Sequence, residues 1–228
     1  MSLGLTGAEW SALRLSITVA CGCVLVSAIP GIALGWLLAR KRFPGHGALN
    51  ALLHLPLVLP PVAVGYALLL LLGRNGALRG FVPDLAFSWW AAVIASAVMG
   101  FPLLVRSVRL GVELVEPRLE EAARTLGASP FRIFRTVTLP LSLPGVITGL
   151  VLAFARSLGE FGATITFAGN IFDETRTIPL ALFNAIQTPG GEAVAGRLLG
   201  LSIALSLIAL LVSEWIAARV RRRIGRSS

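Results

Sequence analysis

The chain has a single lysine, Lys41, and only two cysteines and two histidines among its 228 residues. A Walker-type phosphate loop needs a lysine in a Gly-x-x-x-x-Gly-Lys-Ser/Thr pattern, and the residues before Lys41 do not form one, so the chain cannot hold ATP in this way. Cys21 and Cys23 have neither a second cysteine pair nor a histidine cluster to complete a metal site. They are interpreted as small packing residues, and no cofactor or metal is expected in this chain.

Charged residues are scarce as well. They make up 14% of the chain, whereas hydrophobic residues make up 56% and the mean hydropathy is +0.83. This composition lies outside the range of ordinary soluble domains and indicates a protein whose solvent is the lipid bilayer. The net charge of +9 does not indicate a nucleic-acid partner, because the basic residues gather at the ends of apolar runs instead of forming one face.

Apolar runs long enough to cross a bilayer, about 20 residues each, occur five times with short connections between them. The sequence therefore predicts an all-α, polytopic membrane helix bundle of about five transmembrane helices, which forms one domain over residues 1–228. The predicted spans are Leu15–Ala39, Ala48–Leu72, Ser88–Val105, Pro144–Phe167 and Leu198–Ala218.

Basic residues assign sides to these spans. Residues 40–42 carry three positive charges, residues 106–135 carry six arginines and residues 219–226 carry five, which is 14 of the 20 in the chain. Positive residues favour the cytoplasmic side of a membrane. With five crossings, all three segments fall on that side if the N-terminus is outside and the C-terminus is cytoplasmic.

Prolines interrupt the first and second spans, at Pro30 and at Pro56, Pro60 and Pro61. A proline inside a helix frees a backbone carbonyl, which must then be satisfied by a neighbouring helix, water or a cavity. This favours a helix bundle with a pathway over a simple anchor, although kinked packing alone also accounts for it. No internal repeat is evident, so a symmetric pathway would come from two copies of the chain.

The segment between the third and fourth spans is predicted to fold as two short helices joined by a turn. Gly127 suits a left-handed C-terminal cap, and Ser129 with Pro130 suits the start of the second helix. Phe131, Phe134 and Val137 share one side of that second helix. A helix pair that projects from the membrane with a partly apolar surface is a docking element for another protein; a solvated helical loop is the alternative.

Glu121-Ala122-Ala123, Gly127 and the closing Leu139-Pro140 resemble, at this spacing, the EAA loop of bacterial ABC importer permeases. In that family the loop couples the permease to an ATPase, which implies a coupling loop at residues 118–140. The resemblance also implies a homodimer that binds two cytoplasmic ABC ATPase subunits, which hold ATP and magnesium, and an extracytoplasmic oxyanion-binding protein. The coupling residues that it implies are Glu121, Ala122, Ala123, Gly127, Phe131, Leu139 and Pro140.

Arg156 and Glu160 are predicted to lie near the middle of the fourth span, four residues apart on one helix face. Charges at that depth usually face the protein interior and pair with one another. They either line a polar pathway, together with Ser157 and Thr164, or form a buried packing pair. His54 in the second span is a further polar lining group or a satisfied packing residue.

Residues 156–164, Arg-Ser-Leu-Gly-Glu-Phe-Gly-Ala-Thr, resemble the oxyanion branch of these importers, which moves sulfate, molybdate and tungstate. The stretches 174–179 and 186–192 most resemble the molybdate permeases of that branch. The resemblance implies a permease that imports molybdate or tungstate by alternating access and is not itself an enzyme, with a sulfate or thiosulfate permease and a noncatalytic membrane scaffold as alternatives. An intramembrane enzyme is disfavoured, because it needs a nucleophile and base, a metal pair or two carboxylates, whereas the spans offer Glu160 beside Arg156, Glu214 near an end and His54 alone.

The segment between the fourth and fifth spans, residues 169–196, is longer than a turn requires. Pro179 is suited to start a short apolar helix over 178–186. We expect this helix to contact the binding protein or to cap the outer side of the bundle, unless it lies on the bilayer surface.

Overall fold

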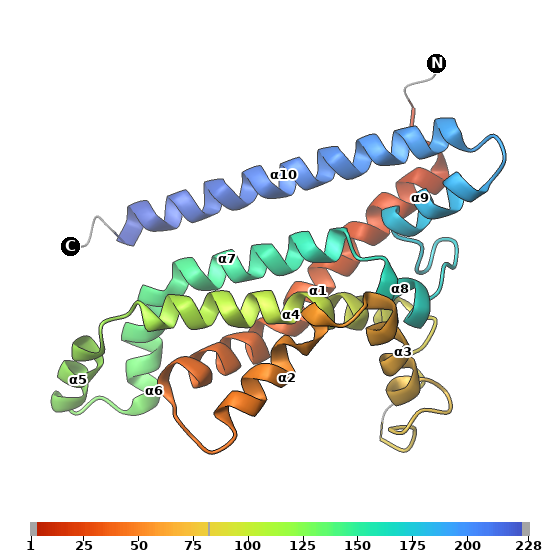
Figure 1. Cartoon of the computed structure of the whole chain (residues 1–228). Coiled ribbons are helices and arrows are strands. Elements are labelled where there is room, and N and C mark those ends of the chain that lie inside the picture. Colours follow the sequence, from red (N-terminus) through yellow and green to blue (C-terminus); the bar gives the residue numbers. More distant parts are fainter. Residues whose placement is uncertain (1–3, 82, 225–228) are drawn as a thin grey trace.

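A computed structural model of the protein describes residues 4–81 and 83–224, and every regular element in those two ranges is helical. The all-α fold predicted from the sequence is confirmed (Figure 1). The elements are α1 Gly7–Arg40, α2 His46–Val58, α3 Pro61–Leu72, α4 Trp89–Glu113, α5 Pro117–Thr125, α6 Pro130–Ile133, the π-helical segment η1 Phe134–Thr138, α7 Leu139–Leu158, α8 Gly162–Phe167, α9 Ile178–Gln187 and α10 Glu192–Ile224.

Three of the predicted spans are continuous helices, namely the first in α1, the third in α4 and the fifth in α10. The helices α5 and α6, the end of α1 and the C-terminal end of α10 lie at the same end of the bundle (Figure 1). We call it the basic end, because residues 40–42, 106–135 and Arg219 belong to it. The helices α3, α8 and α9 lie toward the opposite end.

The second predicted span is not one helix. It divides into α2 and α3, whose axes differ by 116° across a break at Leu59 and Pro60. Leu59 is extended (φ −70°, ψ 144°), as expected of a residue before proline, and Pro61 occupies the first turn of α3, where its missing N–H costs no hydrogen bond. The two consecutive prolines therefore end one helix and start the next.

The fourth predicted span, residues 144–167, is also not a single helix, so that prediction was wrong. The helical segment over residues 130–158 begins earlier than predicted and ends at Leu158, and α8 follows after a break at residues 159–161. Gly159 ends α7. Arg156 thus lies in the last turn of α7, and Glu160 lies in the break and not in the middle of a helix.

The core forms where α4 packs between α1 and α7, as the central helix of the bundle (Figure 1). Glycines allow these helices to approach closely: a Cβ added to Gly145 of α7 would lie 2.7 Å from the Cα atom of Gly111 in α4. Small residues serve this purpose in membrane helices, where dispersion contacts replace hydrophobic exclusion from water. The buried apolar side chains of this core include Leu104, Val108, Val112 and Val146.

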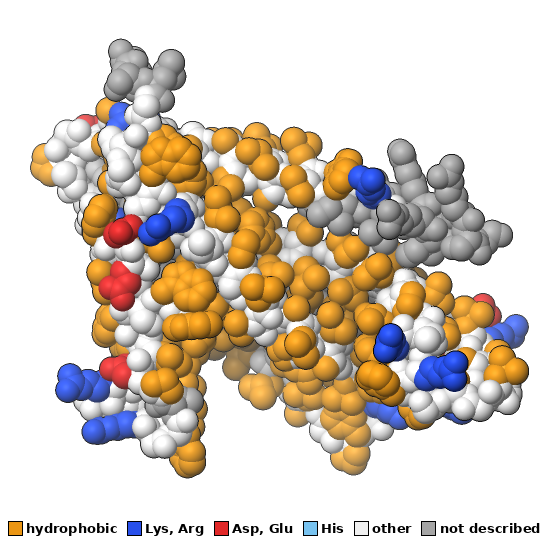
Figure 2. All heavy atoms as spheres, turned by 180° about the vertical axis from the view of Figure 1, so that it is seen from behind, with side chains coloured by type: hydrophobic (Ala, Val, Ile, Leu, Met, Phe, Trp, Pro, Cys, Tyr) orange, Lys and Arg blue, Asp and Glu red, His pale blue; other side chains and the backbone are white. Residues whose placement is uncertain are grey.

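Apolar side chains also cover much of the outer surface (Figure 2). In α10 the exposed fraction of Leu211 is 68% and that of Leu207 is 54%. Such exposure would be costly in water and is normal for a helix that faces lipid or a second membrane chain. The outer face of α10 is therefore suited to the membrane interior.

Candidate functional site

The predicted coupling segment forms an arm at the basic end (Figure 1). Helix α5 ends in a Schellman motif: the N–H of Gly127 donates to the carbonyl of Arg124 (3.0 Å) and that of Ala128 donates to Ala123 (3.1 Å). Gly127 has a φ of +81°, and the Ser129 hydroxyl accepts from the N–H of Arg132 at the start of α6. The predicted cap at Gly127 and the predicted helix start at Ser129 are both confirmed.

The second short helix of the predicted pair is not a separate element. Helix α6 continues through η1 into α7, so that residues 130–158 are one continuous helical segment. Pro140 has no N–H to donate to the carbonyl one turn earlier. Just before Pro140 the hydrogen bonds are π-helical, and the N–H of Leu139 donates to the carbonyl of Phe134, five residues earlier. The predicted coupling segment therefore contains one separate helix, α5, which is joined to the basic end of the helical segment 130–158.

The predicted coupling residues are mostly accessible. Glu121, Ala122, Gly127, Phe131 and Pro140 are exposed, whereas Ala123 and Leu139 are half-buried. Large apolar side chains add to this surface, since Leu126 is 87% exposed and Phe131 72%. Phe134, which was predicted to share a side with Phe131, packs edge-on against Trp36 of α1, with ring centroids 5.8 Å apart, and both phenylalanines line the same apolar groove beside α1. The arm thus presents an exposed apolar patch, and the contact of Phe134 with Trp36 holds the arm against α1.

A second attachment involves Glu120, which the sequence did not single out. Its Oε1 accepts from Arg40 Nε of α1 at 3.0 Å and from the Thr138 hydroxyl of η1 at 2.8 Å. Arg40 also donates to the carbonyl of Val115 (2.8 Å), and the Arg40 and Glu120 side chains are only 14% and 15% exposed. The network joins α5 to α1 and to η1, which continues into α7.

The two broken spans meet one another near the other end of the bundle. A Cβ added to Gly65 of α3 would lie 2.6 Å from the carbonyl oxygen of Ala163 in α8, and one added to Gly162 would lie 2.7 Å from Pro61 Cβ. The backbones of α3 and α8 are therefore in direct contact. Irregular backbone at membrane depth is tolerated where it is buried in protein or lines a cavity, and in transporters it often marks the pathway.

Arg156 and Glu160 form an ion pair at this junction, with Arg156 Nη1 2.6 Å from Glu160 Oε2. Glu160 Oε1 accepts from the N–H of Ala163 (2.9 Å), in the first turn of α8, where the helix dipole favours a negative charge. The Glu160 side chain is 1% exposed and that of Arg156 28%. The pair spans the break between α7 and α8, and Glu160 Oε2 lies close to Arg156 without the geometry of a hydrogen bond.

The other two predicted pathway residues, Ser157 and Thr164, are buried on either side of the same break. The Ser157 hydroxyl has no hydrogen-bond partner in the part of the chain that the structure describes, and the same holds for Ser27 on α1. The structure thus brings all four predicted pathway residues to one junction, which is packed and closed in this conformation.

A methyl group at Gly65 is expected to disrupt this junction. Gly65→Ala would place its Cβ against the backbone of Ala163, which cannot rotate away, so we expect a loss of about 1 to 3 kcal/mol in stability and a lower unfolding temperature of the detergent-purified protein. Gly200→Ala on α10, where nothing lies within 4 Å, is the control and should leave that temperature unchanged or slightly higher. Equal unfolding temperatures for the two variants would contradict the close contact of α3 with α8.

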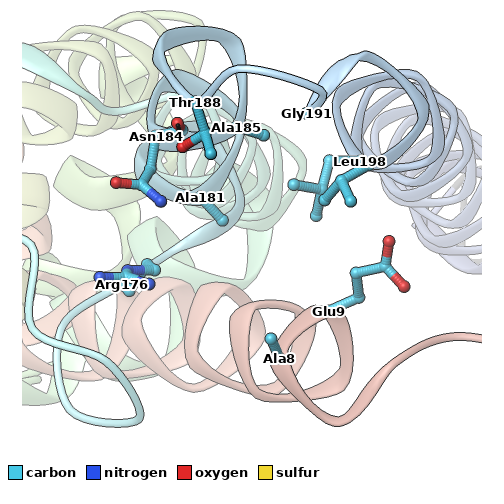
Figure 3. A pocket seen from close by; sticks show the side chains of 10 residues that line it. Ala8, Glu9, Arg176, Ala181, Asn184, Ala185, Thr188, Gly191 and Leu198 are labelled. Carbon is cyan, nitrogen blue, oxygen red and sulfur yellow. Dashed lines mark hydrogen bonds between the residues drawn. The ribbon is translucent and has the colours of Figure 1, made fainter.

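The end opposite the arm carries a cap. The predicted helix after Pro179 is present as α9, and the N–H of Ile178 donates to Ser16 Oγ of α1 (2.8 Å). Glu9 of α1, 1% exposed, pairs with Arg197 Nε of α10 at 2.7 Å. Beside this pair lies a cavity of about 210 Å³, toward which Arg176, Asn184 and Thr188 contribute polar groups (Figure 3). The ends of α1, α9 and α10 are thus joined around a partly polar hollow.

Comparisons with known proteins agree with this architecture. The family model described as "Binding-protein-dependent transport system inner membrane component" matches residues 31–226. The molybdenum transport system permease protein ModB of Escherichia coli (strain K12) is 58% identical over 227 residues, which cover 97% of this chain and 99% of the relative. The sulfate transport system permease protein CysT of Salmonella typhimurium is 35% identical over 221 residues, covering 94% and 78%.

The fold has solved counterparts as well. A chain of the MetNI methionine ABC transporter in an inward-facing conformation superimposes with a TM-score of 0.70 at 17% identity, covering 93% of this chain and 94% of the other. At this identity the likeness concerns the fold alone. The match of the family model over most of the chain, together with the 58% identity, shows that this chain belongs to the family of binding-protein-dependent transport system inner membrane components.

Proposed function

We propose that this chain is the membrane-spanning permease subunit of an ATP-driven importer that carries molybdate into the cytoplasm. The observation that carries the proposal is the 58% identity to a molybdenum permease over nearly the full length of both chains. The arm is consistent with it, because a permease without its own nucleotide site needs a surface through which a separate ATPase can act. ATP and magnesium would then be held by that partner.

The distribution of charge orients the chain. The basic end would be cytoplasmic, since positive residues favour that side. The N-terminus would then be outside, the C-terminus inside and the arm in the cytoplasm, within reach of an ATPase. The cap formed by α9 and the ends of α1 and α10 would face outward, where an oxyanion-binding protein delivers the substrate.

Two copies of the chain would enclose the pathway. A single chain leaves many apolar side chains of α2 and α10 exposed, and a symmetric partner would cover part of this surface. The two arms would be drawn together when the ATPase subunits close on ATP. Because Glu120 joins the arm to α1 and η1 continues into α7, this movement would tilt the helices around the pathway and expose it outward.

A tetrahedral dianion needs hydrogen-bond donors and positive charge without a permanent trap. Sulfate has the same shape and charge, and the 35% identity to a sulfate permease makes it the second candidate substrate. Uptake of radioactive molybdate and sulfate into proteoliposomes that contain the permease, its ATPase and ATP, with and without the binding protein, separates the two. We expect molybdate uptake that requires the binding protein. Uptake of sulfate alone would mean that sulfate is the substrate, and no uptake of either anion would favour a noncatalytic scaffold.

The arm should lose its function when Gly127 is replaced by valine. A β-branched residue at a φ of +81° costs about 1 to 2 kcal/mol, whereas the space around the Cβ position is open, so the effect comes from the backbone alone. We expect Gly127→Val to release the Schellman motif and uncouple ATP hydrolysis from molybdate uptake in proteoliposomes. Gly127→Asn, which tolerates this conformation better, should retain coupling; normal coupling in the valine variant would argue against the arm as the coupling element.

A further inference from the structure

Helix α2 carries three polar residues in an otherwise apolar sequence, namely His46 at its first position and Asn50 and His54 further along. Asn50 and His54 are four residues apart and therefore lie one helical turn from one another on the same side. They face α4, where Arg106, Arg109 and Glu113 are also spaced by three and four residues.

These residues line a cavity of about 330 Å³ near the basic end, which is completed by Leu110. Arg109 is held in place on both sides: its Nε donates to Glu113 Oε1 (2.8 Å) and its Nη1 donates to Asn50 Oδ1 (3.2 Å). One ring nitrogen of His54, Nδ1, lies 2.8 Å from the carbonyl oxygen of Asn50. The walls of the cavity are thus fixed by hydrogen bonds within the protein.

The side chains that line the cavity carry a net positive charge. Glu113 offsets Arg109, while Arg106 is exposed and forms no ion pair with any carboxylate among the side chains that the structure describes. Asn50 uses its carbonyl oxygen on Arg109, which leaves its NH₂ group as a donor toward the cavity. His54 Nδ1 must donate to the Asn50 carbonyl, so Nε2 is the ring nitrogen that remains. Arg109, which is fixed by its two hydrogen bonds, the amide donor of Asn50 and the positive charge of Arg106 suit an anion with several acceptor oxygens.

Helix α2 connects this cavity to the break between α2 and α3. His54 lies five residues before Leu59, which is about 7.5 Å along a helix. The cavity is therefore placed between the junction of the two broken spans and the basic end of the bundle. An ion that passed the junction would meet these residues before it reached the cytoplasm.

We propose that the cavity formed by Asn50, His54, Arg106 and Arg109 is an exit site that binds the tetrahedral oxyanion on the cytoplasmic side of the pathway. The inference rests on the proposed function and adds a place for the substrate. Arg106 supplies a planar fork that can bind two oxygens at once, and Arg109 and Asn50 supply further donors. Glu113, at the edge of the cavity, limits the attraction, which keeps the site weak enough for the ion to leave.

The test compares Arg106→Gln with Arg42→Gln, a matched variant that removes the same charge from the exposed loop between α1 and α2. Crystals of the full transporter are soaked in tungstate, whose tungsten atom is located by anomalous scattering. We expect a tungsten peak in the cavity of the wild type and of Arg42→Gln, and at least about tenfold weaker binding in Arg106→Gln. A tungsten peak that persists unchanged in Arg106→Gln, or no peak here in the wild type, would overturn the proposal.

A phospholipid head group offers the same tetrahedral phosphate chemistry, so the experiment must separate the two sources. Native mass spectrometry of the wild type and the two variants reports bound phospholipid. A lipid that the wild type and Arg42→Gln retain and that only Arg106→Gln loses, with no tungsten in the cavity, would show that the cavity binds lipid and not substrate. Wild-type molybdate uptake is measured on the same preparation. If that uptake is absent, the proposed function fails whatever the tungsten result, and if it is present without a tungsten peak, only the exit site fails.

Discussion

Arg156→Ala is expected to cost about 3 to 5 kcal/mol in stability, because it leaves the carboxylate of Glu160 buried without its ion-pair partner. Glu160 is 1% exposed, and the one hydrogen bond it would keep, from the N–H of Ala163, does not neutralise a full charge. The break between α7 and α8 should then open, and with it the contact of α8 with α3. We expect less protein in the membrane and a much lower unfolding temperature of what can be purified.

Two further variants test the physical reason for this loss. Arg156→Ala combined with Glu160→Ala should be more stable than Arg156→Ala alone, because the buried charge is then absent. Arg14→Ala removes an ion pair whose side chains are 67% and 57% exposed, and an exposed pair of this kind contributes about 0 to 1 kcal/mol. If Arg156→Ala behaved like Arg14→Ala, the pair at the break would have no role in holding the two segments together.

Glu120→Ala is expected to have an effect of similar size at the basic end. The variant would leave Arg40, 14% exposed, with only its hydrogen bond to the Val115 carbonyl, and it would free the Thr138 hydroxyl. Breaking a buried ion pair by removing one partner costs about 3 to 5 kcal/mol, and we expect the lower half of that range because the pair is not fully enclosed. Loss of the attachment should also reduce molybdate uptake more than ATP hydrolysis.

The adjacent residue provides the matched control. Glu121 is exposed, so Glu121→Ala should change stability by no more than about 0.5 kcal/mol. Thermal unfolding of the two purified variants measures the stability, for which Glu121→Ala is the control. A lower unfolding temperature for Glu121→Ala than for Glu120→Ala would contradict the assignment of Glu120 as the residue that attaches the arm.

Local rules predicted the parts of the fold that depend on neighbouring residues. The caps at Gly127 and Ser129 and the helix start at Pro179 follow from the conformations that these residue types favour, and the structure has all three. The number of apolar segments also followed from hydropathy alone. These features need no knowledge of what packs against them.

The features that the sequence missed have different physical causes. Glu120 binds Arg40, 80 positions away, and neither residue reveals the other by its spacing. The bend of 116° after Leu59 leaves the hydropathy of residues 48–72 uninterrupted. Hydropathy therefore does not distinguish one continuous span from two half-spans joined by a bend. The spacing of Arg156 and Glu160 correctly indicated a pair, but the helix end at Gly159 was hidden because the apolar run continues into α8.

The most direct test of the account is the molybdenum content of cells grown at limiting external molybdate, in a strain without this protein and in the same strain with it restored. Sulfate uptake is measured in parallel. The account predicts a molybdenum deficit that restoration repairs, with sulfate uptake unchanged. A sulfate deficit with normal molybdenum, or no deficit in either, would contradict the proposed function.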